Sequence, residues 1–329
     1  MFVVDATRPF SVPTKLTDVA VFSFGAAPPT PPTCYGFGCI GGTYLFRHSD
    51  RARVEPKNKP IMPQIQRPDV FQVGEAYEGY VGRWSRSVAS AFIDWLALPS
   101  RGRWLDVGCG TGVLTEVILS RAAPIGVTGI DSSEGFIAHA RRQSRDPRAN
   151  FESGNAEAMP FPDGAFDAVV SGLVLNFVSH PQKVIAEMRR ALRAGGTAAF
   201  YVWDYAGKMQ LMRYFWDAAV ALDTDALTLD EARRFSMCKP EPLLTLLEGG
   251  GFDRCECRTI DVPTVFANFD EYWLPFLGGQ GSAPTYCSSL SDQRRSKLRD
   301  HLRATLPIDR DGAIRLTARA WAVRGVNSI

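Results

Sequence analysis

The sequence lacks any long apolar run. None of its hydrophobic stretches approaches the roughly 20 residues that a membrane-spanning helix needs, and Asp5 and Arg8 interrupt the N-terminal run that a secretory signal would require. The chain also lacks a dominant charge, because 37 basic and 35 acidic residues leave a formal net charge of +2 over 329 residues. Such a balance offers no extended field to nucleic acid or an anionic membrane. We therefore expect a cytoplasmic globular protein with no membrane insertion and no nucleic-acid partner.

The seven cysteines lack the spacing of a metal site or a disulfide framework. No CxxC pair repeats and no histidine stands at zinc spacing, so we expect free thiols and no metal. Cys109 is notable because it stands between two glycines. A role as a small filler is favoured there, and the alternative is a thiol close to a ligand.

The first part of the chain lacks uninterrupted helix or strand patterns. Prolines recur from Pro9 to Pro63 and break every long candidate element. We expect residues 1–66 to form a poorly ordered N-terminal extension and residues 67–329 to form the folded domain. The oligomeric state is left open.

The rest of the chain has clear periodicity. A first helix with one apolar and aromatic face is expected from Tyr77, Tyr80, Val81, Trp84, Val88, Ala91, Phe92 and Trp95. Strands are then expected at residues 103–107, 126–131, 150–153, 166–175 and 197–203, and helices at 113–121, 135–142 and about 184–192, the last stopped by Gly195 and Gly196. This alternation predicts an α/β fold with a doubly wound, mostly parallel sheet in three α/β/α layers.

Later segments complete the predicted sheet and cover it. Residues 254–262 and 314–323 alternate well enough to form an antiparallel pair at the sheet edge. Residues 204–234 and 269–306 carry helical patterns rich in aromatics, and we expect them to be insertions over the carboxyl ends of the strands, where open α/β sheets bind ligands. The aromatics Tyr272, Trp273 and Phe276 are either packing or a substrate wall.

The most informative segment is LDVGCGTG at residues 105–112. A buried strand passes there into a glycine-rich turn and then a helix, which predicts a nucleotide-type pocket. Glycines suit the turn because a ligand or another backbone approaches where a Cβ would collide, and because glycine reaches positive φ without strain. Asp131 ends the second strand and Asn155 follows the third, so three polar features fall at the carboxyl ends of successive strands.

These motifs resemble the class I S-adenosylmethionine-dependent methyltransferases. The resemblance covers about residues 72–329 and depends on LDVGCGTG, on GIDSSEGFIAHAR at residues 129–141 and on NAEAMPFPDGAFDAVVSG at residues 155–172. The middle section is most similar to the ubiquinone and menaquinone biosynthesis type. The resemblance implies a Rossmann-like fold, S-adenosylmethionine as cofactor, and methyl transfer to a small acceptor, for which the aromatic insertions favour an apolar or aromatic molecule.

We predict a cofactor site made of Arg83, Asp106, Gly108, Cys109, Gly110, Thr111, Gly112, Asp131, Ser132, Asn155, Ala156 and Gly172. Asp131 would accept hydrogen bonds from both ribose hydroxyls, and the backbone of the glycine turn would approach the methionine portion. Asp106 would orient the turn or meet the ammonium through water. Asn155 and the Ala156 N–H would read the adenine edge. Arg83 is the candidate for the cofactor carboxylate, and backbone near Gly172 would close the site.

Each assignment has a structural alternative. Asp131 is followed by two serines and can cap the next helix, Asn155 can form a turn, and Asp106 can hold the N–H groups of the glycine turn. Asn155 also departs from the Asp that many relatives carry, although it matches the quinone-type branch. No catalytic base is compelling among Asp204, Tyr205 and His301.

Two other functions compete with methyl transfer. A nicotinamide dehydrogenase also has a glycine turn followed by an acidic residue, but GxGxG lacks the two-residue gap before the last glycine of that fingerprint. A non-catalytic S-adenosylmethionine-binding or regulatory protein would keep the same pocket with a blocked acceptor cavity.

Overall fold

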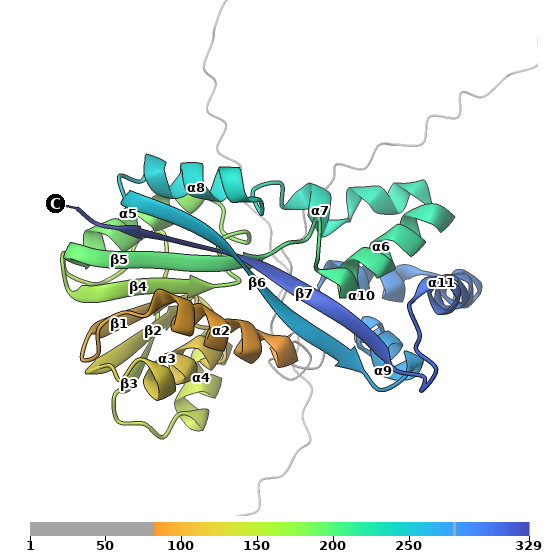
Figure 1. Cartoon of the computed structure of the whole chain (residues 1–329), viewed down its shortest axis with the longest axis horizontal. Coiled ribbons are helices and arrows are strands. Elements are labelled where there is room, and N and C mark those ends of the chain that lie inside the picture. Colours follow the sequence, from red (N-terminus) through yellow and green to blue (C-terminus); the bar gives the residue numbers. More distant parts are fainter. Residues whose placement is uncertain (1–81, 279–280, 329) are drawn as a thin grey trace, which may run out of the picture. The chain divides into compact units, whose positions relative to one another are not determined.

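A seven-stranded sheet forms the centre of the folded part that the structure describes (Figure 1). The computed structural model describes residues 82–278 and 281–328. Its strands follow the spatial order β3-β2-β1-β4-β5-β7-β6. Their bounds are β1 Arg103–Val107, β2 Gly126–Asp131, β3 Ala149–Ser153, β4 Phe166–Gly172, β5 Leu192–Trp203, β6 Asp253–Phe266 and β7 Ile314–Val326. The predicted strands are confirmed, although β4 ends three residues earlier than the apolar run of the sequence.

The sheet is mostly parallel, as expected. β1 to β5 pair in parallel, whereas β7 is antiparallel to both β5 and β6. The antiparallel strand therefore lies one position inside the edge, and β6 forms the edge itself. Residues of β7 before Ala320 no longer pair with β5 but still pair with β6, so the β6–β7 pair extends beyond the carboxyl end of β5.

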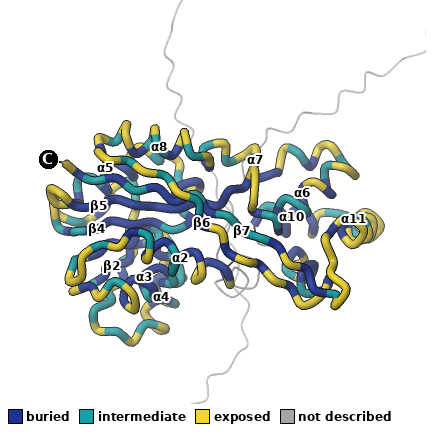
Figure 2. Tube along the Cα trace, in the orientation of Figure 1, coloured by how far each residue is buried: buried dark blue, intermediate teal, exposed yellow. Residues whose placement is uncertain are grey.

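Helices cover both faces of the sheet and make the expected three layers. Their bounds are α2 Arg83–Leu96, α3 Val113–Arg121, α4 Glu134–Gln143, α5 Pro181–Ala191 and α8 Pro240–Gly249. α2, α3 and α4 lie on one face, and α5 and α8 lie together on the other (Figure 1). The central strands are buried on both sides, whereas the outer surfaces of the helices are exposed (Figure 2). Continuous burial explains the apolar run in β4, because a strand covered on both faces has no polar side.

The two insertions form a helical cap. Its elements are α6 Gln210–Leu222, η2 Thr224–Thr228, α7 Glu231–Arg234, α9 Phe269–Trp273, η3 Leu274–Leu277, α10 Ser282–Ser289 and α11 Asp292–Thr305. The rings of Phe215 and Phe276 stack with centroids 4.4 Å apart, and the Tyr272 hydroxyl donates to the Leu211 carbonyl at 2.9 Å. Tyr272, Trp273 and Phe276 are all buried. These three aromatics are therefore packing.

One predicted helix end needs correction, and some predictions concern residues that the structure does not describe. The helix before β5 ends at Ala191, ahead of Gly195 and Gly196, because Leu192 already pairs with Phe166 of β4. The N-terminal extension at residues 1–66, and Tyr77, Tyr80 and Val81 of the first helix, fall outside the described residues. Every cysteine of the described region is a free thiol. None of the described helices is long and apolar enough to cross a membrane.

Candidate functional site

The glycine turn between β1 and α3 has the backbone that the sequence predicts. Gly108, Gly110 and Gly112 have φ of +72°, +54° and +92°. A Cβ on Gly108 would lie 2.5 Å from Val174, so this turn packs directly against the segment that follows β4. A Cβ on Gly110 would meet nothing within 4 Å, so the turn faces open space there. Thr111 is half-buried at the same turn.

Asp131 faces this turn from the end of β2. Its Oδ2 accepts a hydrogen bond from Gly110 N at 3.0 Å, and its Oδ1 accepts one from Ser133 N at 2.8 Å. Burial raises the pKa of this carboxyl, and the two N–H donors oppose that shift. The helix cap is supplied by Ser133, whose hydroxyl accepts from Phe136 N, while Ser132 is exposed. Each oxygen of Asp131 keeps a lone pair for a ligand hydroxyl.

Asp106 is a buried carboxyl with one oxygen unused. It lies on β1 at 1% exposure, and its Oδ2 accepts from the hydroxyl of Thr115 on α3 at 2.8 Å. Its Oδ1 has no partner among the described residues. Burial raises the pKa of Asp106 to about 7, the nearby charge of Asp131 adds to the rise, and the Thr115 hydrogen bond opposes it. A cation beside Oδ1 would stabilise the ionised form.

Cys109 is a small filler in the core, which is the role that the sequence favoured. It packs with Ile137, Ala140 and Phe151 in a small apolar cluster, and a Cβ on Gly129 would lie 2.8 Å from its sulfur. Burial raises the pKa of the thiol, so Cys109 is not activated as a nucleophile. Its backbone N–H donates to the Ile130 carbonyl and thereby fixes the turn.

Asn155 forms a turn, which was the structural alternative to its predicted contact with adenine. Its Oδ1 accepts from Glu157 N at 2.9 Å, and the residue is exposed, with Ala156 half-buried beside it. Glu157 in turn accepts from His180 through both the backbone N–H and Nδ1, which ties this segment to the start of α5. The assignment of Asn155 and Ala156 to adenine stays a prediction.

Gly172 ends β4 against an aromatic ring. A Cβ at this position would lie 2.5 Å from the Tyr201 hydroxyl oxygen, so only glycine lets the two strands approach. The segment beyond it contains Asn176, which our sequence reasoning missed and whose amide is buried without a hydrogen-bond partner in residues 82–278 and 281–328. The sequence could have indicated this residue, because Asn176 is an amide inside the apolar run at residues 173–178.

Arg83 is engaged elsewhere. Its guanidinium pairs with Glu271 of α9 at 2.5 Å and lies over the rings of Trp84 and Phe266. These contacts join Arg83 to the cap, and none of them, within the described residues, reaches the glycine turn. Its role toward a cofactor carboxylate stays a prediction that would require this pair to open.

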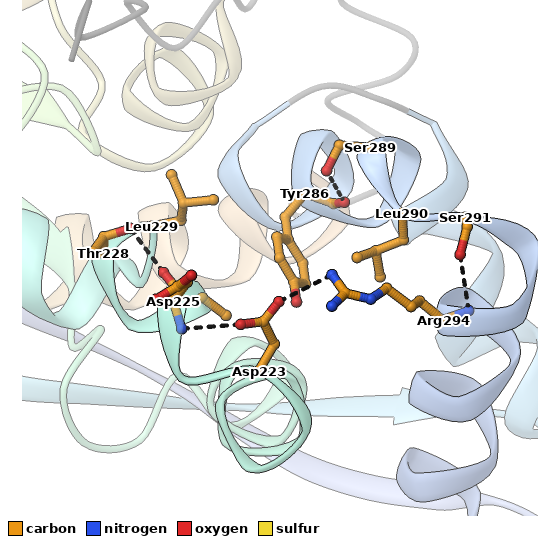
Figure 3. Close-up of a pocket in the computed structure, with 10 residues that line it drawn as sticks. Asp223, Asp225, Thr228, Leu229, Tyr286, Ser289, Leu290, Ser291 and Arg294 are labelled. Atoms are coloured by element: carbon orange, nitrogen blue, oxygen red, sulfur yellow. Dashed lines mark hydrogen bonds and ion pairs between the residues drawn. The ribbon is translucent and has the colours of Figure 1, made fainter. Parts of the chain in front are cut away.

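A cavity of about 610 Å³ lies within the cap (Figure 3). It is lined by Asp223, Asp225, Ala226, Thr228, Leu229, Tyr286, Ser289, Leu290, Ser291 and Arg294. Arg294 reaches across it to Asp223, with Nη1 and Oδ2 at 3.3 Å. None of the lining residues belongs to the glycine turn or to the end of β2, so this cavity is separate from the candidate site.

Comparisons with known proteins agree with this geometry. Residues 105–200 match a family described as a methyltransferase domain. A demethylmenaquinone methyltransferase from Renibacterium salmoninarum is 38% identical over 118 residues, which are 36% of this chain and 46% of that protein. The chloroplastic 2-methyl-6-phytyl-1,4-hydroquinone methyltransferase 2 of Oryza sativa subsp. japonica is 36% identical over 137 residues, or 41% and 39% of the two chains.

The sequence similarity to curated relatives covers only part of this chain, whereas the similarity in fold covers more of it. This chain spans less than half the length of the curated relatives that it matches. A crystal structure of a candidate methyltransferase from Bacillus halodurans C-125 superimposes with a TM-score of 0.50 at 15% identity, covering 74% of this chain and 100% of the other, which supports the fold alone. The matched segment includes the glycine turn, Asp131 and Asn155. Residues 105–200 therefore resemble a methyltransferase domain, as the motifs predicted.

Proposed function

We propose that this chain is an S-adenosylmethionine-dependent methyltransferase that acts on a small, apolar or aromatic acceptor. The hydrogen bond between Gly110 N and Asp131 Oδ2 supports this proposal most directly, because it brings the glycine turn and the acidic residue of the neighbouring strand to one place. The half-satisfied Asp106 is a second support. A cytoplasmic location is part of the same proposal.

The residues at this place fit the groups of S-adenosylmethionine. The cofactor presents a ribose diol, an ammonium and a sulfonium but no phosphate, so its pocket needs hydrogen-bond acceptors more than a basic cradle. Asp131 offers two carboxylate oxygens with remaining lone pairs, and Asp106 offers a buried oxygen that has no partner in the part of the chain the structure describes. The open space at Gly110 leaves room for close approach to the backbone.

The chain's own contribution would be binding and alignment. When bound, the cofactor supplies a methyl group already activated by positive sulfur. Asp131 and the glycine turn would fix its position, and the cap would help to exclude water and orient the acceptor, which can provide most of the acceleration of an in-line displacement. A dedicated base is optional for activated carbon nucleophiles and amines.

Turnover tests the activity directly. The protein is incubated with S-adenosylmethionine and a panel of phenols, quinols and aromatic amines, and release of S-adenosylhomocysteine is measured. We expect release above background with at least one aromatic acceptor. Binding of S-adenosylmethionine without turnover on any acceptor would contradict the proposal and favour a non-catalytic binding protein.

A further inference from the structure

Asn176 has a buried side chain that finds no hydrogen-bond partner among the described residues. It is 8% exposed, and neither Oδ1 nor Nδ2 meets a donor or acceptor in the part of the chain that the structure describes. A buried amide left unpaired destabilises the folded state, and such groups are rare in proteins. A ligand that pairs with the amide would account for its presence.

The position of Asn176 supports a ligand-binding role. It lies in the turn after β4 that Phe177 N closes onto the Val174 carbonyl at 2.8 Å. Val174 in the same turn lies against Gly108. β4 also pairs with β1, with Asp106 opposite Val170. Asn176 thus follows the strand next to the one that carries the glycine turn, at the same carboxyl edge of the sheet.

We propose that the Asn176 amide binds the substrate that receives the methyl group. It would pair with an edge of that substrate on which a hydrogen-bond donor lies beside a hydrogen-bond acceptor. This inference rests on the proposed methyl transfer. An amide presents an NH₂ donor and a carbonyl acceptor in one plane, so it pairs with two adjacent hydroxyls or with a hydroxyl beside a carbonyl. The matching substrate class is a ring with two neighbouring oxygen substituents.

The aromatic side chain that follows Asn176 in the sequence belongs to a cluster of rings that suits such a substrate. Phe177 is 41% exposed, and its ring lies 5.1 Å from that of Phe235, between centroids. Phe235 also lies 5.1 Å from the ring of Tyr205, which follows β5. Rings of this kind favour flat apolar molecules. The amide would then select among such molecules by their polar edge, because a site built for hydrogen bonds rejects analogues that lack them.

Thermal stability tests whether the amide is unpaired. Asn176→Leu keeps a similar volume and removes both polar atoms, so we expect the melting temperature of the ligand-free protein to rise by about 2 °C or more. Asn327→Leu is the matched control, because Asn327 is 9% exposed and its Nδ2 donates to the carbonyls of Arg189, Leu192 and Arg193. This control should lower the melting temperature. A comparable fall for Asn176→Leu would overturn the proposal.

Binding tests what the amide recognises. The probes are 2,3-dihydroxynaphthalene and 2,3-dimethoxynaphthalene, titrated into protein saturated with S-adenosylmethionine. We expect the full-length protein to prefer the dihydroxy probe, and Asn176→Leu to reduce that preference about tenfold or more while its affinity for S-adenosylmethionine stays unchanged. No preference in the unmodified protein, an unaltered preference in the variant, or weaker cofactor binding by the variant would each overturn the assignment. Failure of the unmodified protein to bind S-adenosylmethionine would refute the proposed function itself.

Discussion

Two carboxyl groups dominate the candidate site at the scale of single residues. Asp106 lies one residue before the end of β1 and Asp131 ends the neighbouring β2, and the pKa of each is raised mainly by burial. The charge of Asp131 further raises the pKa of Asp106. A site with two partly desolvated carboxyls favours a cationic ligand, because a positive charge stabilises their ionised forms. The electrostatics therefore agree with a cofactor that carries an ammonium and a sulfonium.

The raised pKa of Asp106 predicts how cofactor binding depends on pH. In the folded protein the pKa is about 7 against 3.8 for the ordinary group, so the ionised form destabilises the fold. The stability that Asp106 contributes is complete below a pH of about 4 and is lost as the pH rises through 7. The ionised form is also the one that attracts the ammonium. The affinity for S-adenosylmethionine should therefore rise between about pH 6 and 8.

Calorimetric dissociation constants across this range test that prediction. Asp106→Asn is the control variant, because it removes the titration and should show a weaker dependence on pH. Affinity that falls as the pH rises in the unmodified protein would contradict the role of Asp106.

At the scale of elements, the strand, turn and helix from β1 to α3 determine the site. The three glycines of the turn have different surroundings, although all have positive φ. Gly108 is packed against Val174, whereas Gly110 faces open space beside Asp131. The turn therefore combines one glycine needed for packing with another that leaves room for a ligand.

Alanine substitutions should separate these two uses. Gly108→Ala should destabilise the protein strongly, because a Cβ would clash with Val174 in addition to the strain of positive φ. Gly110→Ala should cost only the strain, about 1–2 kcal/mol, but should weaken cofactor binding because its Cβ enters the open space. Chemical denaturation and calorimetry measure the two effects. Equal losses of stability, with cofactor affinity retained in folded Gly110→Ala, would contradict this account.

The sequence predicts elements better than it predicts contacts. β1, β2 and α3 could be bounded to the residue, because buried strands and a glycine turn leave strong local patterns. The pairing of Arg83 with Glu271 could not be predicted, since it joins residues far apart in the chain. The turn at Asn155 was foreseen only as an alternative, because the same amide suits a turn and an adenine edge.

At the scale of the whole molecule, a helical cap is connected to the sheet through the end of β5 and through two long strands, β6 and β7. β6 and β7 extend past the parallel strands, and α9, η3, α10 and α11 connect their far ends, whereas α6, η2 and α7 follow β5 (Figure 1). Within the cap, the half-buried Arg213 forms an ion pair with the buried Asp230, and Trp216 donates to the buried Glu231. All the described helices and strands begin at or after Arg83. The sheet and its cap are therefore assembled from residues that follow the proline-rich segment.

Deletion of residues 1–66 tests the predicted division of the chain. We expect the remaining protein to keep its melting temperature and its cofactor affinity, because the proline-rich segment shows no pattern of a core element. Differential scanning calorimetry of both forms is the measurement. A fall in melting temperature of about 4 °C or more, which corresponds to at least 1 kcal/mol, would indicate that the segment is docked.

The most direct test of the central claim is a calorimetric titration with S-adenosylmethionine and, separately, with NAD. We expect binding of S-adenosylmethionine only, and Asp131→Ala should weaken it by about 1–3 kcal/mol through loss of charged hydrogen bonds without unfolding the protein. Asp94→Ala is the matched control, because it removes an exposed carboxylate that pairs with Arg121 on the surface, and it should bind normally. Binding of NAD in place of S-adenosylmethionine, or unchanged affinity in Asp131→Ala, would contradict the account.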